Sequence, residues 1–173
     1  AGVPAVGVRI QVDGEGEVLA RSNHVFEGYW NQPEETGKAI VEGWFHTGDG
    51  GHREDAFVVI SDRKKDMIIT GGENVSSIEV EDCLYRHQGV AEAAVIGVPH
   101  EKWGETVLAF VVLRPGVELT ARDVIDHCRG LLSHYKCPTV VEFRDTLPRT
   151  ATGKLQKFRL REPYWAGRAR GVN

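Results

Sequence analysis

Two patterns of hydrophobic and polar positions follow one another along the chain, and the first is typical of β-strands. Short segments with apolar and polar residues in alternation, bounded by turn residues, predict strands. These segments are residues 6–12, 17–21, 44–47 and 57–60. The strand at 44–47 is expected to stop at the glycine-rich segment 48–51. Pro33 and the two glutamates after it predict a helix that ends near Gly43. The first 62 residues are therefore expected to form an incomplete, all-β unit with one helix.

The second pattern, from residue 67 onward, alternates strands with amphipathic helices. Capping-box patterns predict a helix from Ser76 to about Arg86 and another from Thr120 to about Leu132. The apolar run 106–113 predicts a central strand. The other predicted elements are strands at 67–70, 90–98 and 139–143 and a short final helix at 154–161. This order of elements predicts an α+β domain of about 100 residues.

Five consecutive charged residues, Asp62 to Asp66, separate the two patterns. Such a run between apolar strands predicts a turn or an inter-domain linker rather than core. The charge balance also changes there: residues 1–62 carry 11 acidic and 4 basic residues, a net charge of −7, whereas residues 63–173 carry +3. The domain boundaries expected from this are 1–62 and 67–173, joined by residues 63–66.

Composition excludes several classes of protein. With 173 residues, 41% hydrophobic and 27% charged, the chain is typical of a soluble globular protein. Its longest apolar run, 107–113, is too short to span a bilayer. No secretory signal pattern and no initiator Met are present, so a piece processed or excised from a longer chain is expected. The three widely spaced cysteines favour a reducing, cytoplasmic location, and no metal site is predicted.

Three local features carry candidate chemistry, and the first is Asp49 in a glycine-bounded turn that begins at Thr47. A carboxylate exposed on such a turn can accept two hydrogen bonds from a vicinal diol such as that of a ribose. The alternative is an Asx turn that binds no ligand.

The second feature is Arg63 together with Gly71-Gly72. The guanidinium offers a planar fork for phosphate or ribose oxygens, and the paired glycines permit a thin ligand to approach the backbone. A solvated hinge and a simple tight turn are the alternatives. The third feature is Lys154 in a loop of small residues, where it presents a mobile point charge to a phosphate or a developing oxyanion. An exposed lysine at the start of the last helix is the alternative.

The order of these features along the chain resembles that of a known family. The segments that carry the resemblance are Gly28-Tyr29-Trp30-Asn31, residues 43–49, residues 62–75, residues 95–99, Lys102-Trp103-Gly104-Glu105, Tyr135-Lys136-Cys137-Pro138 and the loop at Lys154. Together they cover nearly the whole chain. The sequence resembles the AMP-forming acyl-CoA synthetases (fatty-acid or carboxylate–CoA ligases) of the acyl-adenylate-forming superfamily.

The resemblance implies a C-terminal fragment of such a ligase. Residues 1–62 would be an all-β remnant of the large N-terminal, AMP-binding domain. Residues 67–173 would be a small α+β lid domain, with a central mixed sheet flanked by helices. The implied reaction activates a carboxylate with ATP to an acyl-adenylate and transfers the acyl group to coenzyme A. The implied small molecules are ATP or AMP, Mg²⁺, coenzyme A and a carboxylic acid, and the chain's own N-terminal domain is the implied partner.

Roles implied by the resemblance fall on single residues of this chain. Asp49 and Thr47 would bind the nucleotide ribose, and Arg63 the ribose or phosphate. Lys65 would be the hinge. Lys154 would be the catalytic residue that bridges the reacting carboxylate and the α-phosphate. The approach of the pantetheine arm would be lined by Gly71, Gly72 and Glu73.

Departures from the family pattern limit these implications. The family's phosphate loop, acyl pocket and magnesium-binding glutamate are absent, so this chain alone is expected not to catalyse adenylation. Lys157 stands where the family frequently has Arg. An adenylating enzyme that loads a carrier protein is the alternative of the same class. The alternative of a different class is a non-catalytic module whose basic segment, Arg144 to Arg170, meets nucleic acid or an acidic partner.

Overall fold

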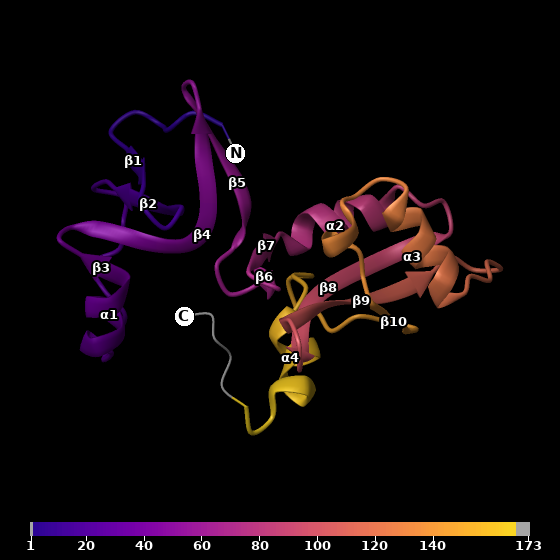
Figure 1. Cartoon of the computed structure of the whole chain (residues 1–173). Helices are drawn as coiled ribbons and strands as arrows, with labels where there is room; N and C mark the ends of the chain where they lie inside the picture. The colour runs from indigo at the N-terminus through magenta and orange to yellow at the C-terminus, as the bar shows by residue number, and fades with distance from the viewer. Residues whose placement is uncertain (1, 169–173) are drawn as a thin grey trace. The chain divides into compact units, whose positions relative to one another are not determined.

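The computed structural model describes residues 2–168, and its chain divides into two compact units (Figure 1). The units are Ala1–Lys65 and Asp66–Asn173. The division lies inside the charged run at 62–66. The hinge role of Lys65 stays a prediction, and the end of the basic segment, Arg170 included, lies outside the described residues.

The first unit is a five-stranded antiparallel sheet with one short helix among its described residues. The strands are β1 (Arg9–Val12), β2 (Glu17–Arg21), β3 (Ile40–Val41), β4 (Trp44–Glu54) and β5 (Phe57–Arg63), and the helix is α1 (Pro33–Ala39). They lie in the order β1-β2-β4-β3, with β5 on the other part of β4. Val18, Leu19 and Val58 are the buried apolar residues of this sheet. These three residues form only a small buried core, and the incompleteness of this unit stays a prediction.

The prediction that the strand at Trp44 stops before Gly48 is wrong, because β4 continues to Glu54. Its second half pairs with β5 from Asp49 opposite Arg63 to Glu54 opposite Phe57, and the register shifts between Gly50 and Gly51. A Cβ on Gly51 would lie 2.4 Å from the carbonyl oxygen of Val59. Glycine therefore permits the close strand pairing here instead of ending the strand.

The prediction that the whole charged run lies outside the core is also wrong. Strand β5 includes Asp62 and Arg63, and Asp62 is only 1% exposed. Its Oδ1 accepts a hydrogen bond from the backbone N–H of Arg63 at 2.7 Å. A buried carboxylate is tolerated when its oxygens have donors, which the sequence pattern does not reveal.

The second unit is an α+β domain around a mixed sheet. Its strands are β6 (Ile68–Thr70), β7 (Glu73–Val75), β8 (Val90–His100), β9 (Gly104–Leu113) and β10 (Val140–Phe143). Its helices are α2 (Ser77–Tyr85), α3 (Ala121–Arg129), the 3₁₀ turn η1 (His134–Lys136) and α4 (Lys157–Trp165). The order is β10-β9-β6-β7 with β8 also on β9, and only β10 runs parallel to its neighbour. The predicted fold class and central strand are confirmed.

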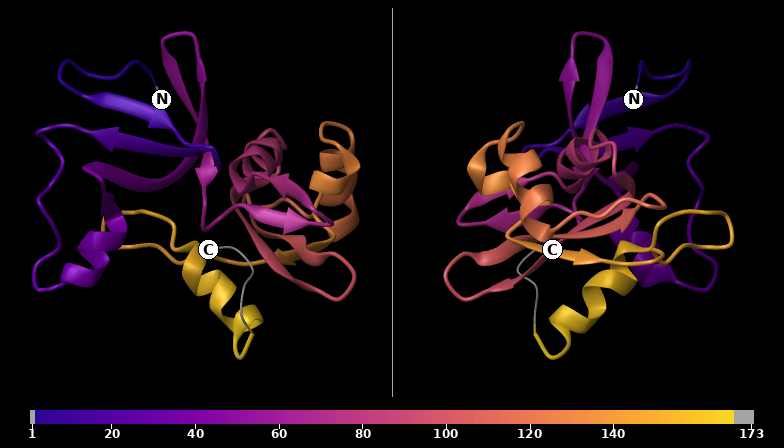
Figure 2. Two further views of the ribbon diagram at one scale, coloured as in Figure 1. Left: turned by 60° about the vertical axis from the view of Figure 1, so that its left-hand side comes forward. Right: turned by 90° about the vertical axis from the view of Figure 1, so that its right-hand side faces the viewer.

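Helices cover both faces of this sheet (Figure 2). Buried residues of α2 and α3, such as Leu84 and Val124, pack with Val95 and Val107 on one face. On the other face, Leu160 and Tyr164 of α4 pack with a second cluster that contains Phe110 and Ile96. The alternating side chains of β8 and β9 therefore supply two separate cores.

The two predicted capping boxes differ in outcome. Thr120 Oγ1 accepts from the backbone N–H of Asp123, whose carboxylate accepts from the Thr120 N–H, so the box is complete. Ser76 Oγ accepts a hydrogen bond from the Glu79 N–H at 3.3 Å and so caps the N-terminus of α2. The final helix begins at Lys157, three residues later than predicted. Among residues 2–168, no helix is both long and apolar enough to cross a membrane.

Candidate functional site

Asp49 and Arg63 form the first part of the candidate site, on neighbouring strands of the first unit. They are directly paired across β4 and β5, and Arg63 Nε lies 3.5 Å from Asp49 Oδ1. The side chains are 35% and 70% exposed, respectively. The strand register thus presents a carboxylate and a guanidinium together to solvent, where one can accept and the other can donate hydrogen bonds.

Thr47 shapes the backbone beside Asp49. Its hydroxyl donates to the carbonyl oxygen of Val18 at 2.5 Å and accepts from the Asp49 N–H at 3.1 Å. Gly48 between them has φ +73°, a conformation that favours glycine. The Thr47 hydroxyl proton is thus already donated within the sheet. Contact of Thr47 with a nucleotide stays a prediction.

Glu17 holds the backbone at Gly48 in place, and the sequence analysis gives it no role. Its side chain is 8% exposed, and its Oε1 accepts from the Gly48 N–H at 2.9 Å. Oε2 lies 3.2 Å from His46 Nδ1 and 3.3 Å from Lys64 Nζ. Burial alone raises the pKa of this carboxyl. The Gly48 N–H, His46 and Lys64 outweigh that effect and hold the pKa of Glu17 below its ordinary value.

The Gly71-Gly72 pair forms the turn of a β6–β7 hairpin, where the sequence predicts only the end of a strand. Thr70 pairs with Glu73 across it, and the glycines have φ values of 59° and 88°, as a two-residue type I′ turn requires. Gly71 N–H donates to the Trp103 carbonyl at 2.9 Å. A Cβ on Gly71 would lie 3.0 Å from the Trp103 ring, so glycine permits this close packing.

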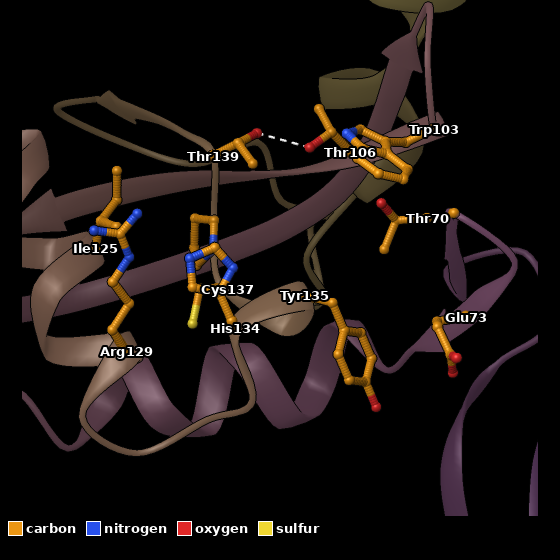
Figure 3. A pocket seen from close by; sticks show the side chains of 12 residues that line it. Thr70, Glu73, Trp103, Thr106, Ile125, Arg129, His134, Tyr135, Cys137 and Thr139 are labelled. Carbon is orange, nitrogen blue, oxygen red and sulfur yellow. Dashed lines mark hydrogen bonds between the residues drawn. The ribbon is translucent and has the colours of Figure 1, made fainter.

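A pocket of about 530 Å³ opens beside this hairpin in the second unit (Figure 3). Trp103, Thr70 and Glu73 lie at one end of it, and Arg129 and Ile125 of α3 lie at the other. The wall is more apolar than polar, and it contains the exposed rings of Trp103 and Tyr135. Aromatic faces with a guanidinium at the far end suit a ligand with a flat ring and negative charge.

Trp103, Tyr135 and Arg129 are site residues that the sequence analysis left without a role. Trp103 is 46% exposed and Lys102 Nζ lies 4.5 Å from the centre of its ring. Tyr135 is 44% exposed, although it belongs to a short 3₁₀ turn that packs on the domain. The sequence does contain a signal for Trp103 and Tyr135, because both are large aromatic residues in segments that connect predicted strands and helices.

Lys154 lies in a compact loop of the second unit. The loop is closed by the pairing of Arg149 with Leu155 and by a bond from the Thr150 N–H to the Lys154 carbonyl at 2.8 Å. The Lys154 N–H donates to Thr150 Oγ1 at 3.0 Å. The side chain is exposed, and its ammonium forms no ion pair with any residue in the range 2–168. A positive charge held on a defined backbone is thus available for an anion.

The predicted site residues are divided between the two units. Thr47, Asp49 and Arg63 lie together in the first, and the exposed Lys65 ends it. The hairpin residues and Lys154 belong to the second, and Lys154 does not line the pocket. In the part of the chain that the structure describes, no group of three His, Cys, Asp or Glu side chains is placed to hold a metal ion.

Much of the basic charge in the segment after residue 143 is already neutralised. Four ion pairs do this: Arg144–Glu142, Arg149–Glu92, Lys157–Glu81 and Arg161–Asp66. Two of them connect side chains that are mostly buried. The described part of this segment is therefore an anchored part of the domain rather than a continuous cationic face.

The second unit contains the C-terminal domain of an AMP-binding enzyme. Residues 79–154 match the family model described as AMP-binding enzyme C-terminal domain. The structure resembles ATP-bound MatB from Rhodopseudomonas palustris with a TM-score of 0.89 and 38% identity, covering 97% of this chain and 36% of that one. The chain thus resembles the C-terminal part of acyl-adenylate-forming enzymes and contains an AMP-binding enzyme C-terminal domain at residues 79–154.

Curated relatives likewise align with nearly the whole of this chain but with only part of their own length. A 2-methylpropanoate–CoA ligase of Humulus lupulus is 46% identical over 165 residues, which is 92% of this chain and 30% of that protein. A fatty acid–[acyl-carrier-protein] ligase of Streptomyces coeruleorubidus is 44% identical over 184 aligned positions, covering 100% of this chain and 36% of that protein. The chain thus spans about a third of the length of these relatives.

Proposed function

We propose that the whole protein is an AMP-forming acid–thiol ligase and that this chain supplies part of its nucleotide site and its lid. In the first half-reaction, a carboxylate oxygen attacks the α-phosphorus of ATP, and pyrophosphate leaves. In the second, the thiol of coenzyme A attacks the acyl carbon, AMP leaves, and the thiol proton is lost to solvent. A fatty acid is the proposed carboxylate. The cytoplasmic location stays a prediction.

The observation that carries this proposal is the adjacent pair of Asp49 and Arg63. A carboxylate accepts both hydroxyl protons of a ribose, and a guanidinium beside it donates to ribose or phosphate oxygens. Exposure of both side chains leaves them accessible to a nucleotide. Mg²⁺ is a proposed cofactor of the whole protein, and none of the roles proposed for this chain involves holding it.

Lys154 is the proposed catalytic residue of the first half-reaction. Its unpaired ammonium would stabilise the charge that develops between the carboxylate and the α-phosphate. In this proposal the second unit acts as a lid that rotates about Lys65, the last residue of the first unit. A second orientation would then bring the Gly71-Gly72 turn to the acyl-adenylate.

The pocket beside that turn is the proposed receptor for coenzyme A. The narrow turn leaves room for the pantetheine arm, while Trp103 and Tyr135 offer faces for the adenine ring and Arg129 offers a positive charge for its phosphates. The relative from Streptomyces coeruleorubidus favours a carrier protein as the second candidate acceptor. A carrier protein presents the same thiol arm but no adenine.

The half-reactions of the full-length protein test the role of Lys154. Lys154→Ala is expected to abolish carboxylate-dependent pyrophosphate exchange and to spare thioester formation from pre-made acyl-adenylate. Arg159→Ala removes an exposed positive charge nearby and serves as the matched control. Equal loss of both half-reactions in Lys154→Ala would remove the proposed role.

The hinge needs a separate variant. Lys65→Pro fixes φ and is expected to slow thioester formation selectively, whereas Lys65→Ala removes the same charge and leaves the backbone free to rotate. Unchanged thioester formation in Lys65→Pro would place the rotation elsewhere.

The acceptor is identified by competition. The full-length protein with pre-made acyl-adenylate is given coenzyme A or a phosphopantetheinyl carrier protein. Trp103→Ala and Tyr135→Ala should raise KM for coenzyme A about tenfold or more, and leave KM for a carrier protein nearly unchanged. Transfer to the carrier protein alone would overturn the coenzyme A assignment in favour of the second candidate.

A further inference from the structure

Lys154 and Lys157, three residues apart, have opposite environments. The Lys154 side chain is exposed and forms no ion pair with a described residue. The Lys157 side chain is only 11% exposed and its Nζ lies 2.7 Å from Glu81 Oε1 and 2.7 Å from Ser77 Oγ. Ser77 is fully buried and Glu81 is 13% exposed. One lysine is therefore free while the other is fixed in the protein.

The position of Lys157 at the start of α4 is unfavourable for a positive charge. Lys157 is the first residue of the helix, whose first turn contains no acidic residue. A positive charge there is opposed by the positive end of the helix dipole. The contact with Glu81 and Ser77 must outweigh that cost, so the side chain is held by specific partners and not by the helix.

Glu81 also connects Lys157 to the sheet. The same oxygen, Oε1, accepts a hydrogen bond from the backbone N–H of Val95 in β8 at 2.7 Å. The start of α4 is thereby joined to α2 and to β8 at one carboxylate. Its neighbours Leu155 and Leu160 pack against the apolar cluster on the far face of the sheet. The segment that follows the Lys154 loop is thus attached to the buried part of the domain.

The other end of the loop has a weaker attachment. Arg149 Nη2 lies 2.6 Å from Glu92 Oε2, and its Nη1 donates to the Gly153 carbonyl at 2.7 Å. The two side chains of this ion pair are 41% and 37% exposed, so solvent screens it. Of the two attachments, the one at Lys157 is more sheltered from water and more strongly determines where the loop lies.

We propose that Lys157, held by Glu81 and Ser77, is the positioning residue for Lys154 in the adenylation half-reaction. This inference rests on the proposed catalytic role of Lys154. Lys157 itself is turned into the domain and meets neither substrate. It fixes the chain three residues beyond Lys154, so that the free ammonium is delivered in one place when the lid carries it to the nucleotide. Catalysis is sensitive to such placement, since an error of about 1 Å can cost about 100-fold in rate.

The test uses the full-length protein and three variants. Lys157→Met keeps the aliphatic stem and removes the charge, Lys157→Arg restores a charged donor, and Tyr164→Phe removes a hydrogen bond to Glu142 from the far end of the same helix. Kinetic constants are measured for pyrophosphate exchange and for thioester formation from pre-made acyl-adenylate. Amide hydrogen exchange of residues 149–156 is measured in the same proteins.

Lys157→Met should lower kcat of pyrophosphate exchange about 10- to 100-fold with KM for ATP nearly unchanged, leave thioester formation within about twofold, and speed amide exchange of residues 149–156. Lys157→Arg should recover most of kcat, and Tyr164→Phe should match the wild type. Unchanged kcat in Lys157→Met would overturn the proposal. Equal loss of both half-reactions, shared by Tyr164→Phe, would also overturn it by showing a merely structural role.

Two further measurements separate the possible failures. If Lys157→Met does not fold, Ser77→Ala removes one of the two acceptors and should give a smaller loss of a few-fold in the same kcat. No loss in a folded Ser77→Ala would then count against the anchor. If Lys154→Ala leaves pyrophosphate exchange intact, the proposed function fails. The amide exchange of residues 149–156 still decides whether Lys157 holds the loop.

Discussion

Asp49 and Arg63 face one another across the β4–β5 pair, with 3.5 Å between Oδ1 and Nε. The register of the two strands brings them together, although each belongs to a different motif of the sequence. Both side chains reach solvent, and Arg63 is 70% exposed. An exposed ion pair of this kind contributes at most about 1 kcal/mol to stability, and the function that we propose for it is ligand binding.

Neutral variants of this pair should separate stability from binding. Asp49→Asn and Arg63→Gln are each expected to change the free energy of unfolding by less than about 1 kcal/mol. In the full-length protein each should weaken AMP binding about tenfold or more, because a charged hydrogen bond to the ligand is lost. Denaturant titration and calorimetry measure the two effects. Strong destabilisation with unchanged AMP affinity would contradict the interpretation.

Glu17 should make the first unit sensitive to acid. Its pKa is lower in the folded chain than its ordinary value near 4.5, so its contribution to stability is complete above that value. The contribution is lost as the pH falls through the lowered pKa. Glu17→Gln should therefore destabilise the chain by about 1–3 kcal/mol at pH 7, and the difference from wild type should shrink below pH 4. Denaturant titration from pH 3 to pH 7 checks this, and a difference independent of pH would contradict it.

The two glycines of the β6–β7 turn offer a matched pair of variants. Gly71→Ala and Gly72→Ala both place a side chain at positive φ, which costs about 1–2 kcal/mol. Only the Cβ at position 71 meets Trp103, at 3.0 Å, whereas nothing lies within 4 Å of the Cβ at position 72. Gly71→Ala should therefore shift the Trp103 indole signal in an NMR spectrum more than Gly72→Ala does. Equal shifts would show that backbone strain alone moves the ring.

All three cysteines should be unreactive in the folded chain. Cys83, Cys128 and Cys137 are free and buried, and burial raises the pKa of each thiol above its ordinary value. The thiolate is the reactive form, so a disulfide reagent at pH 8 should modify none of them until denaturant is added. A thiol that reacts in the folded protein at the rate of a small-molecule thiol would contradict this.

Local signals predicted most elements of the second unit, with strand β7 as the exception. The complete capping box at Thr120 and the serine cap at Ser76 are formed by residues within one turn of each other, so a short stretch of sequence contains all the information. The central position of β9 follows from its continuous apolar run, because a strand with neighbours on both sides and helices on both faces is buried along most of its length.

The first unit was harder to predict, because its features depend on partners far along the chain. The glycines after Thr47 break a strand in isolation, but pairing with β5 extends β4 through them. The burial of Glu17 and Asp62 depends on donors that only the folded sheet brings near. For the candidate site, the residue types of Asp49, Arg63 and Lys154 were evident from sequence. The anchor of Lys157 was not, since Glu81 lies in another helix.

Helix α4 also has a practical consequence for anyone who trims this chain. It holds the domain through Lys157 to Glu81, through Arg161 to Asp66, and through Trp165 Nε1 to the Gly97 carbonyl at 3.0 Å. The family match ends at residue 154, before any of these ties is made. Ending an expressed protein at that residue would remove the helix that covers one face of the sheet and expose Phe110 and Ile96 to solvent. Such a truncated product should aggregate, so the helix belongs in any minimal soluble version of the domain.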